Sequence, residues 1–354
     1  MFQRIWEKYF LKEIALTFIA FIAGFYFLYM LVDFSTRYSA YKSLGLSYGS
    51  IAIYYWFIFI LRVEILVPFA FSIALVRCLC SLNVHNELIA LMGSGTPLKR
   101  LLRPFLLFSL LLTLALFINT EYLYPRASSY LKTVESLKVK SKNEGKNHLS
   151  SVSLPDGSVL FYQNYSFKDK AFQDVFWIRS ADEMIHAKLV YPHEKPPLAV
   201  AVDLLQRNQK NELIPVSSFD QLELTSLSIN PDRLKELLYV PNELPLSELW
   251  GRLGKSSAPA RNGSKEKTVF YKKLLLPWLS VLVFLGVAPF CVRFTRHLPV
   301  FFVYLGSMFS LIAFYLAFNA AIVLGENQVI PPFFALVAPF LGLSALFIWK
   351  YSRI

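Results

Sequence analysis

The sequence predicts an α-helical membrane protein with six transmembrane helices, three on either side of an inserted all-β domain of the jellyroll or sandwich type. Hydrophobic residues make up 55% of the chain and charged residues 17%, whereas soluble domains carry about 25% charged residues. Six apolar stretches are long enough to cross a bilayer. Between the third and the fourth, the pattern changes to the short alternating runs that are typical of strands.

Each apolar stretch approaches or exceeds the roughly 20 residues that a helix needs to cross a hydrocarbon core of about 30 Å. The first stretch follows a charged segment and has no small-residue cleavage site, so we expect a retained helix rather than a signal peptide. The stretches are Ile14–Phe34, Ile51–Val76, Phe105–Tyr124, Leu274–Val292, Val300–Leu324 and Pro332–Trp349.

The basic residues predict the orientation of these passes, because cytoplasmic loops carry an excess of Lys and Arg. With the N-terminus inside, the inner loops and helix ends hold eleven basic residues and the outer ones hold five. The eleven are Arg4, Lys8, Lys12, Arg77, Lys99, Arg100, Arg103, Arg293, Arg296, Lys350 and Arg353, and the five are Arg37, Lys42, Arg126, Lys272 and Lys273. Both termini are therefore predicted to be cytoplasmic and residues 125–270 to lie outside. The same bias explains the net charge of +12, so we expect no nucleic-acid partner.

The outer segment reads as short strands separated by turn residues. Residues Gly251–Lys267, rich in Gly, Ser, Pro and Lys, are expected to form a flexible return to the membrane. The predicted strands are Ser158–Gln163, Gln173–Arg179, Glu183–Tyr191, Leu198–Leu205 and Gln221–Leu227.

No set of residues predicts an enzyme or a metal site. The G-x-S-x-G pattern at Gly45–Gly49 lies in a short loop between two passes, without the strand and the partners that a nucleophile needs. The five histidines have no metal-binding spacing, and the three cysteines are too few for a four-thiolate site. We therefore expect no catalytic residues, no metal and no cofactor bound by this chain.

The inner segment Asn83–Arg103 lies between the second and third passes. A short amphipathic helix is expected from Glu87 to Met92, ended by the following glycines. Thr96 would cap the next helix, with Pro97 at its first position. Such a segment is either a re-entry turn anchored by basic residues or a surface on which a permease docks a motor protein.

Three stretches resemble the lipopolysaccharide-export permease family, LptF/LptG (YjgP/YjgQ). The first is E-L-I-A-L-M-G-S-G-T-P-L-K-R-L-L-R-P at residues 87–104, which resembles the family's cytoplasmic coupling helix. The second is N-T-E-Y-L-Y-P-R at residues 119–126, and the third is L-G-E-N-Q-V-I-P-P at residues 324–332. The stretch Leu31–Asp33 favours the LptG branch over the LptF branch.

The resemblance implies a permease subunit that extracts lipopolysaccharide from the bacterial inner membrane and passes it to a periplasmic jellyroll bridge. Its implied partners are a paralogous permease in a heterodimer, a cytoplasmic ATPase dimer similar to LptB, and periplasmic jellyroll proteins similar to LptC and LptA. ATP would be used by the ATPase and not by this chain. The residues implied to contact the ATPase are Glu87, Leu88, Ala90, Leu91 and Gly95.

The implied domain boundaries follow the same layout. Residues 1–130 would hold the first three passes, with the coupling helix near 84–97. Residues 131–270 would form the periplasmic jellyroll domain with its linkers, and residues 271–354 would hold the last three passes. A free strand edge of the jellyroll would pair with a partner jellyroll.

Basic residues near the outer mouth of the bundle could bind the phosphates of lipid A. They are Arg37, Lys42, Arg126, Lys132, Lys272 and Lys273. Their alternative role is to extend towards the headgroups without specific binding. Arg62 and Glu64 lie inside an apolar stretch, where charges are costly and usually face the bundle interior.

A second reading of the whole chain is a membrane sensor or scaffold that displays an outer β domain. It explains the six passes, but it gives no role to the charged residues inside the second pass or to the coupling-like segment. Dependence on a bound ATPase would separate the transporter from the sensor.

Overall fold

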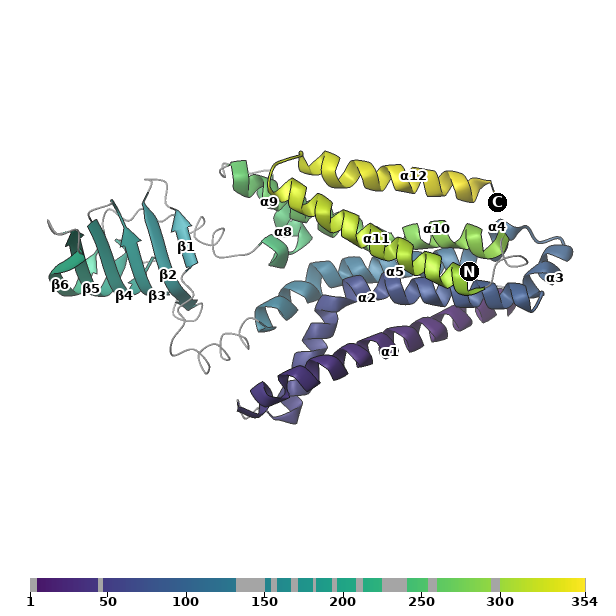
Figure 1. Cartoon of the computed structure of the whole chain (residues 1–354), viewed down its shortest axis with the longest axis horizontal. Helices are drawn as coiled ribbons and strands as arrows, with labels where there is room; N and C mark the ends of the chain where they lie inside the picture. Colours follow the sequence, from purple (N-terminus) through teal and green to yellow (C-terminus); the bar gives the residue numbers. More distant parts are fainter. Residues whose placement is uncertain are drawn as a thin grey trace. The chain divides into compact units, whose positions relative to one another are not determined.

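The computed structural model of the chain contains two compact units, one formed by residues 1–137 with 241–354 and one by residues 138–240. The first unit is helical and the second is a β-sheet (Figure 1). Segment Pro241–Leu275, most of which was predicted to belong to the outer domain, groups with the helices. The structure describes residues 5–43, 47–131, 150–153, 158–166, 171–180, 183–192, 196–207, 213–224, 241–253, 260–293 and 300–353.

Six helices of the first unit are long and apolar enough to cross a membrane, which confirms the six predicted passes. The first two passes are the single helices α1 and α2, whereas the third and the last contain π-helical turns and the fourth contains a 3₁₀ turn. The elements are α1 (Ile5–Ser43), α2 (Tyr48–Val84), α3 (Glu87–Gly93), α4 (Leu98–Leu101), α5 (Arg103–Ile118) with the π turn Asn119–Leu123, the 3₁₀ turn Pro241–Glu243, α8 (Leu246–Leu253), α9 (Ala260–Leu275), the 3₁₀ turn Leu276–Trp278, α10 (Leu279–Arg293), α11 (Val300–Glu326), the π turn Phe333–Val337 and α12 (Ala338–Ser352).

Helices α2 and α10 form the centre of the bundle, and α1 and α12 lie on opposite sides of it (Figure 1). The apolar window of the fourth pass is 67% buried and that of α11 only 11%. Small residues such as Ala70 and Ala74 of α2 are fully buried, so neighbouring backbones approach closely there. The outer helices present large apolar side chains that suit a hydrocarbon surrounding, as lipid-facing helices do.

Proline 68 interrupts the hydrogen-bond pattern inside α2. Proline has no N–H, so the carbonyl of Glu64 one turn earlier has no partner within the helix. The hydroxyl of Tyr315 in α11 donates to that carbonyl at 3.3 Å. The break in α2 is thus satisfied by a neighbouring helix, as membrane proteins require.

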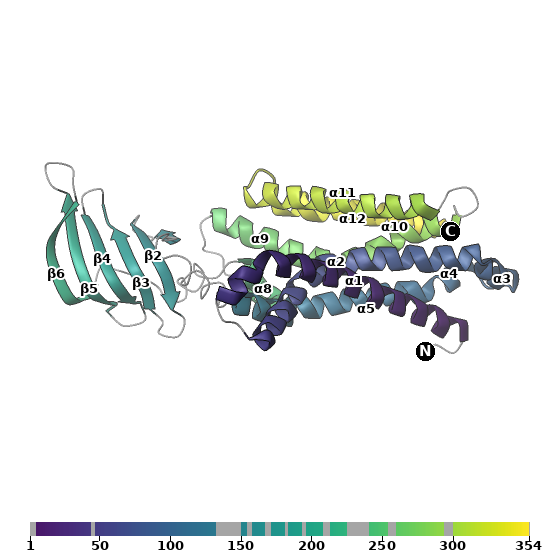
Figure 2. The same ribbon diagram turned by 60° about the horizontal axis from the view of Figure 1, so that its bottom comes forward.

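The second unit is one antiparallel sheet of six strands in sequential order (Figures 1 and 2). Side chains alternate between its two faces, and one face carries a buried cluster that includes Phe172, Val175, Trp177, Ile185 and Val202. The strands are β1 (Ser150–Ser153), β2 (Val159–Ser166), β3 (Ala171–Ile178), β4 (Glu183–Tyr191), β5 (Leu198–Arg207) and β6 (Leu213–Glu223).

The inserted β domain is confirmed, and its described strands make a single sheet in which each strand pairs with the next. The jellyroll arrangement therefore remains an expectation for this unit. Strand β1 was not predicted because its sequence, S-S-V-S, is too polar to show alternation. Strand β6 begins well before the predicted Gln221, because Pro215 hid the strand signal.

The expected flexible return at Gly251–Lys267 is wrong where the structure describes it, because α9 begins at Ala260. Its composition is unfavourable for an isolated helix, but the buried hydroxyl of Ser264 links it to the end of α11, and that of Thr268 bonds within α9. Ser264 Oγ donates to the carbonyl of Gly325 at 2.8 Å, and Thr268 Oγ1 donates to the carbonyl of Ser264 at 2.8 Å. Residues 254–259 lie outside the described ranges.

Candidate functional site

The two ends of the helical unit carry different features, and we call them the α3 end and the α8 end after the short helices found there (Figures 1 and 2). Helix α3 begins after Asn86, which has a left-handed φ of 57°, and is followed by Gly95 with φ of 84°. These two residues reverse the chain, because asparagine and glycine tolerate positive φ. Helix α3 is thus set off from α2 before it and from α4 after it.

Helix α3 has one face on the bundle and one face exposed. Leu88 is 3% exposed and belongs to the main core, and Leu91 packs against that core. Glu87 and Ala90 are exposed, as is Gly95 beyond the helix. Of the predicted coupling residues, Leu88 and Leu91 therefore anchor the helix, and the other three face outward.

Thr96 was predicted to cap the next helix, and this prediction is wrong. Pro97, with extended φ and ψ, precedes α4, which begins at Leu98. The Thr96 hydroxyl instead donates back to the carbonyl of Leu91. The threonine thus closes the turn after α3 and does not start α4.

The α3 end also contains a contact between distant parts of the sequence. Lys99 Nζ donates to the carbonyl of Ser352, the last residue of α12, at 2.9 Å. A lysine at a helix C-terminus also interacts favourably with the helix dipole. The segment after α3 is therefore linked directly to the end of the sixth pass.

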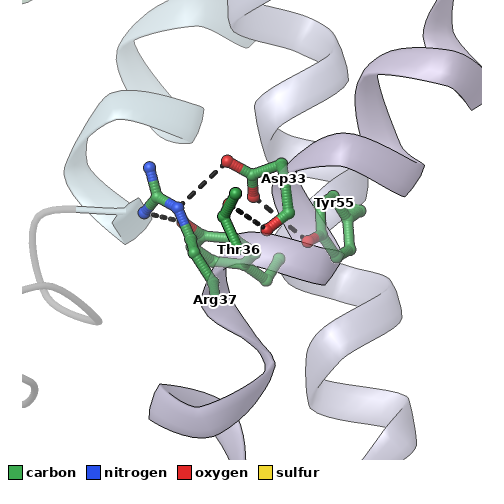
Figure 3. Close-up of polar contacts among 5 residues, drawn as sticks. Asp33, Thr36, Arg37 and Tyr55 are labelled. Atoms are coloured by element: carbon green, nitrogen blue, oxygen red, sulfur yellow. Dashed lines mark hydrogen bonds and ion pairs between the residues drawn. The ribbon is translucent and has the colours of Figure 1, made fainter.

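Arg37 lies in a network between α1 and α2 (Figure 3). Its Nε is 3.0 Å from Asp33 Oδ1, and its guanidinium donates to Tyr54 Oη at 3.2 Å. Tyr55 Oη donates to Asp33 Oδ2 at 3.1 Å. Figure 3 shows the Arg37 guanidinium directed at the Asp33 carboxylate, so part of its charge is neutralised within the chain.

Two further basic residues of the predicted set have aromatic partners. Arg62 is exposed, and its guanidinium lies 5.5 Å from the ring centroid of Tyr29 in α1. Lys273 is buried, and its Nζ lies 5.0 Å from the ring centroid of Tyr124. A cation over an aromatic face is stabilised by the quadrupole of the ring.

The predicted lipid-binding residues do not form one described cluster. Arg37 of α1 contacts Asp33 and Tyr54, whereas Arg62 of α2 and Lys273 of α9 both lie near Tyr124. Lys272 and Lys273 both interact electrostatically with Glu64 of α2. Arg126 is exposed and Lys272 is half-buried. Lys132 lies outside the described residues, as does the side chain of Lys42.

Sequence reasoning missed how the α8 end is held together. Glu121 in the π turn of the third pass accepts hydrogen bonds from both the N–H and the hydroxyl of Ser247 in α8. Lys273 Nζ donates to the carbonyl of Leu244 at 2.5 Å. A buried cluster of Leu244, Leu249, Val269 and Phe270 joins α8 to α9. Glu121 lies within a stretch that the sequence marked, but its partner is more than a hundred residues away.

The family model described as "Lipopolysaccharide export system permease LptF/LptG" matches residues 8–353, nearly the whole chain. The chain belongs to the LptF/LptG family. A search among curated proteins found no match.

Membership of the LptF/LptG family makes the chain a transport permease rather than a catalytic enzyme, and places it in a lipopolysaccharide export system with partner subunits. The match does not separate the LptF branch from the LptG branch, so the LptG prediction remains a prediction. Each of the three stretches that carry the resemblance has a structural position in this LptF/LptG chain. The first forms α3 and α4, the second forms the π turn bound to α8, and the third joins α11 to α12.

Proposed function

We propose that this permease extracts lipopolysaccharide from the bacterial inner membrane, driven by ATP hydrolysis on a separate cytoplasmic ATPase dimer. In this proposal the chain pairs with a paralogous permease, and both termini and α3 face the cytoplasm. The β domain lies in the periplasm and hands the lipid to a jellyroll bridge. The family match over residues 8–353 is the observation that carries the proposal.

Helix α3 is the proposed docking surface for the ATPase. Its exposed residues include Glu87, Ile89 and Met92, so it offers a carboxylate and two apolar side chains for binding. Its buried Leu88 couples any displacement of α3 to the core of the bundle. The link from Lys99 to Ser352 extends that coupling to α12. Movement of the ATPase would thus reach the second, third and sixth passes.

Charge reversal at Glu87 tests this coupling. We expect Glu87→Lys to abolish lipopolysaccharide export, measured by complementation of a depleted strain, while the protein still inserts into the membrane. Glu7→Lys is the matched control, since Glu7 is a half-buried acidic residue of α1 at the same end of the bundle. The control should export normally. Normal export by Glu87→Lys would contradict the proposed role of α3.

The composition of the assembly is tested by affinity purification of the full chain in mild detergent, followed by mass spectrometry of proteins and lipids. A cytoplasmic ATPase, a second six-pass permease and bound lipopolysaccharide are expected together. A protein that purifies without an ATPase, and retains normal function without one, would instead be a sensor or scaffold.

The proposed lipid path uses the basic residues near the α8 end. A photo-crosslinker at Arg37 or Arg62 should capture lipopolysaccharide in active membranes, because both side chains are exposed next to the α1–α2 surface. A crosslinker at Lys273 should capture far less, since its Nζ is buried against Leu244. Equal capture at all three positions would argue against a defined path.

The periplasmic hand-off is proposed to use an edge of the sheet, where a strand can be added by main-chain hydrogen bonds. In the described sheet β1 and β6 are the terminal strands. Strand β6 exposes Ile214, Val216 and Phe219. Crosslinkers along β6 and β1 should capture a jellyroll partner from one of the two, and no capture from either would contradict the hand-off.

A further inference from the structure

A cavity of about 680 Å³ lies between α10, α11 and α12. All three helices belong to membrane-spanning segments, so the cavity lies at the depth of the hydrocarbon core. No predicted lipid-binding residue lines it. Its walls are almost entirely apolar and include Leu282, Phe290, Phe302, Phe314, Leu343 and Phe347.

The length of the cavity matches one leaflet of a bilayer. Its lining on α10 runs from Leu279 to Phe290, which is about 17 Å at a rise of 1.5 Å per residue. Half of a hydrocarbon core is about 15 Å. The cavity is therefore as deep as one acyl chain of a membrane lipid is long.

Basic residues stand at the α3 end of the cavity. Lys350 Nζ lies 3.3 Å from the ring centroid of Phe290, which lines the cavity. Arg353 follows one turn later, at the end of α12, with its guanidinium 3.7 Å from the ring centroid of Trp349. Two cations beside an apolar cavity complement an anionic headgroup attached to an acyl chain.

We propose that this cavity binds an anionic glycerophospholipid from the leaflet at the α3 end. One acyl chain occupies the cavity, and the phosphate lies at Lys350 and Arg353. This site is separate from the proposed path of lipopolysaccharide, and it holds a lipid that is retained rather than transported. Since α12 also accepts the hydrogen bond from Lys99, the bound lipid lies next to the segment that follows α3.

Native mass spectrometry of the full-length protein, incubated with phosphatidylglycerol or phosphatidylcholine, tests the proposal. Phosphatidylglycerol should be retained better by roughly fivefold for each of the two basic side chains near the headgroup. Lys350→Gln combined with Arg353→Gln should remove that preference, and the control Arg100→Gln, an exposed residue of α4 at the same end, should keep it. Equal retention of the two lipids by the wild type would overturn the proposal.

A second pair of variants tests the cavity itself. Gly306 lines the cavity and has nothing within 4 Å of an added Cβ, so Gly306→Leu should place its side chain in the space of the acyl chain. Lipid retention should fall by roughly tenfold or more, the effect of one methylene in a hydrophobic pocket. Gly342→Leu is the control, because Gly342 on α12 is also open but does not line the cavity. Equal losses in both variants would overturn the proposal.

Photo-crosslinking of a lipid to the wild-type protein tests the proposal without depending on whether a variant folds. Phosphatidylglycerol with a photoactivatable group near the end of its acyl chain should label peptides of α10 and α11 around the cavity, including Phe314. Labelling confined to other helices would overturn the assignment. So would recovery of lipopolysaccharide, or of a partner's membrane helix, as the molecule bound at these peptides.

Discussion

The hydroxyl of Tyr315 in α11 donates a hydrogen bond to the main-chain carbonyl of Glu64 in α2, 3.3 Å away. Glu64 is the residue whose helical partner is removed by Pro68. Tyr315 also stacks on Phe69, with ring centroids 5.6 Å apart. A single tyrosine from the fifth pass thus satisfies the defect in the second pass and packs against the residue next to it.

Removal of the Tyr315 hydroxyl should weaken the bundle in a way that depends on Pro68. We expect Tyr315→Phe to cost about 0.6 to 1.7 kcal/mol, the range for hydrogen bonds between membrane helices. In a Pro68→Ala background the cost should approach zero, because the introduced alanine supplies the missing N–H. The free energy of unfolding in mixed micelles is measured for the wild type, the two single variants and the double variant. Equal costs in both backgrounds would show that the carbonyl of Glu64 does not depend on Tyr315.

Lys273 should act as a structural residue of the α8 end. Lys273→Met removes the hydrogen bond to the Leu244 carbonyl, and we expect hydrogen exchange in α8 to accelerate roughly tenfold, a change of about 1.4 kcal/mol. Lys272→Met is the matched control, since Lys272 is the adjacent lysine and only half-buried. If Lys273 serves only to bind lipid, its variant will leave the exchange of α8 unchanged.

Gly325 permits the close approach of α9 to the end of α11. An added Cβ would lie 2.9 Å from Thr268 Oγ1, closer than real side chains approach. We expect Gly325→Ala to destabilise the protein by about 1 to 3 kcal/mol, as overpacking does. Thr268→Ala in the same chain should recover part of that loss, because it removes the atoms in conflict.

The control for this pair is Gly342→Ala, whose added Cβ would meet nothing within 4 Å. Its melting temperature in detergent should match the wild type. A Gly325→Ala protein as stable as this control would mean that α9 can move away from α11 without cost.

Asp33 should limit the attraction of Arg37 for anionic lipids. Asp33→Asn removes the negative charge 3.0 Å from Arg37 Nε and should increase retention of lipopolysaccharide, whereas Arg37→Gln should decrease it. Each change should be roughly fivefold, the effect of one charge near a headgroup. Tyr54→Phe is the control, since it removes a hydrogen-bond partner of Arg37 without changing the charge. If Arg37 has only a structural role, none of the three variants will alter lipid retention.

The passes and the β domain were predictable because their signals are local. An apolar stretch of about 20 residues and an alternation such as that of Glu183–Tyr191 each reflect a nearby environment of lipid or sheet. Helix α3 was predictable within one residue, since Gly93 and Gly95 mark its end. Strand β1 has no such signal, because S-S-V-S becomes a strand only by pairing with Val159–Tyr162 of β2.

The contacts of the candidate site could not be predicted, because the residues that decide them are mostly distant in sequence. The prediction that Arg37 binds lipid phosphate did not include its ion pair with Asp33 on the same helix or its hydrogen bond with Tyr54 of the next. Lys273 was assigned to the same lipid-binding group and is buried against Leu244. An arginine or lysine in the sequence can be either a structural cation or a lipid-binding one. The burial of the side chain and the partner that it contacts distinguish the two roles.

The π turn at Asn119–Leu123 sets the rotational phase of the third pass. At its first residue, Asn119 Nδ2 donates to the carbonyl of Ile60 in α2, and two residues later Glu121 accepts from Ser247 in α8. A π turn contains one residue more than an α-helical path, and one residue corresponds to about 100° of rotation. Deletion of one residue here would restore a regular helix and turn its two ends out of alignment with each other. The extra residue therefore allows one continuous helix to form hydrogen bonds with α2 and with α8, which lie in different directions from it.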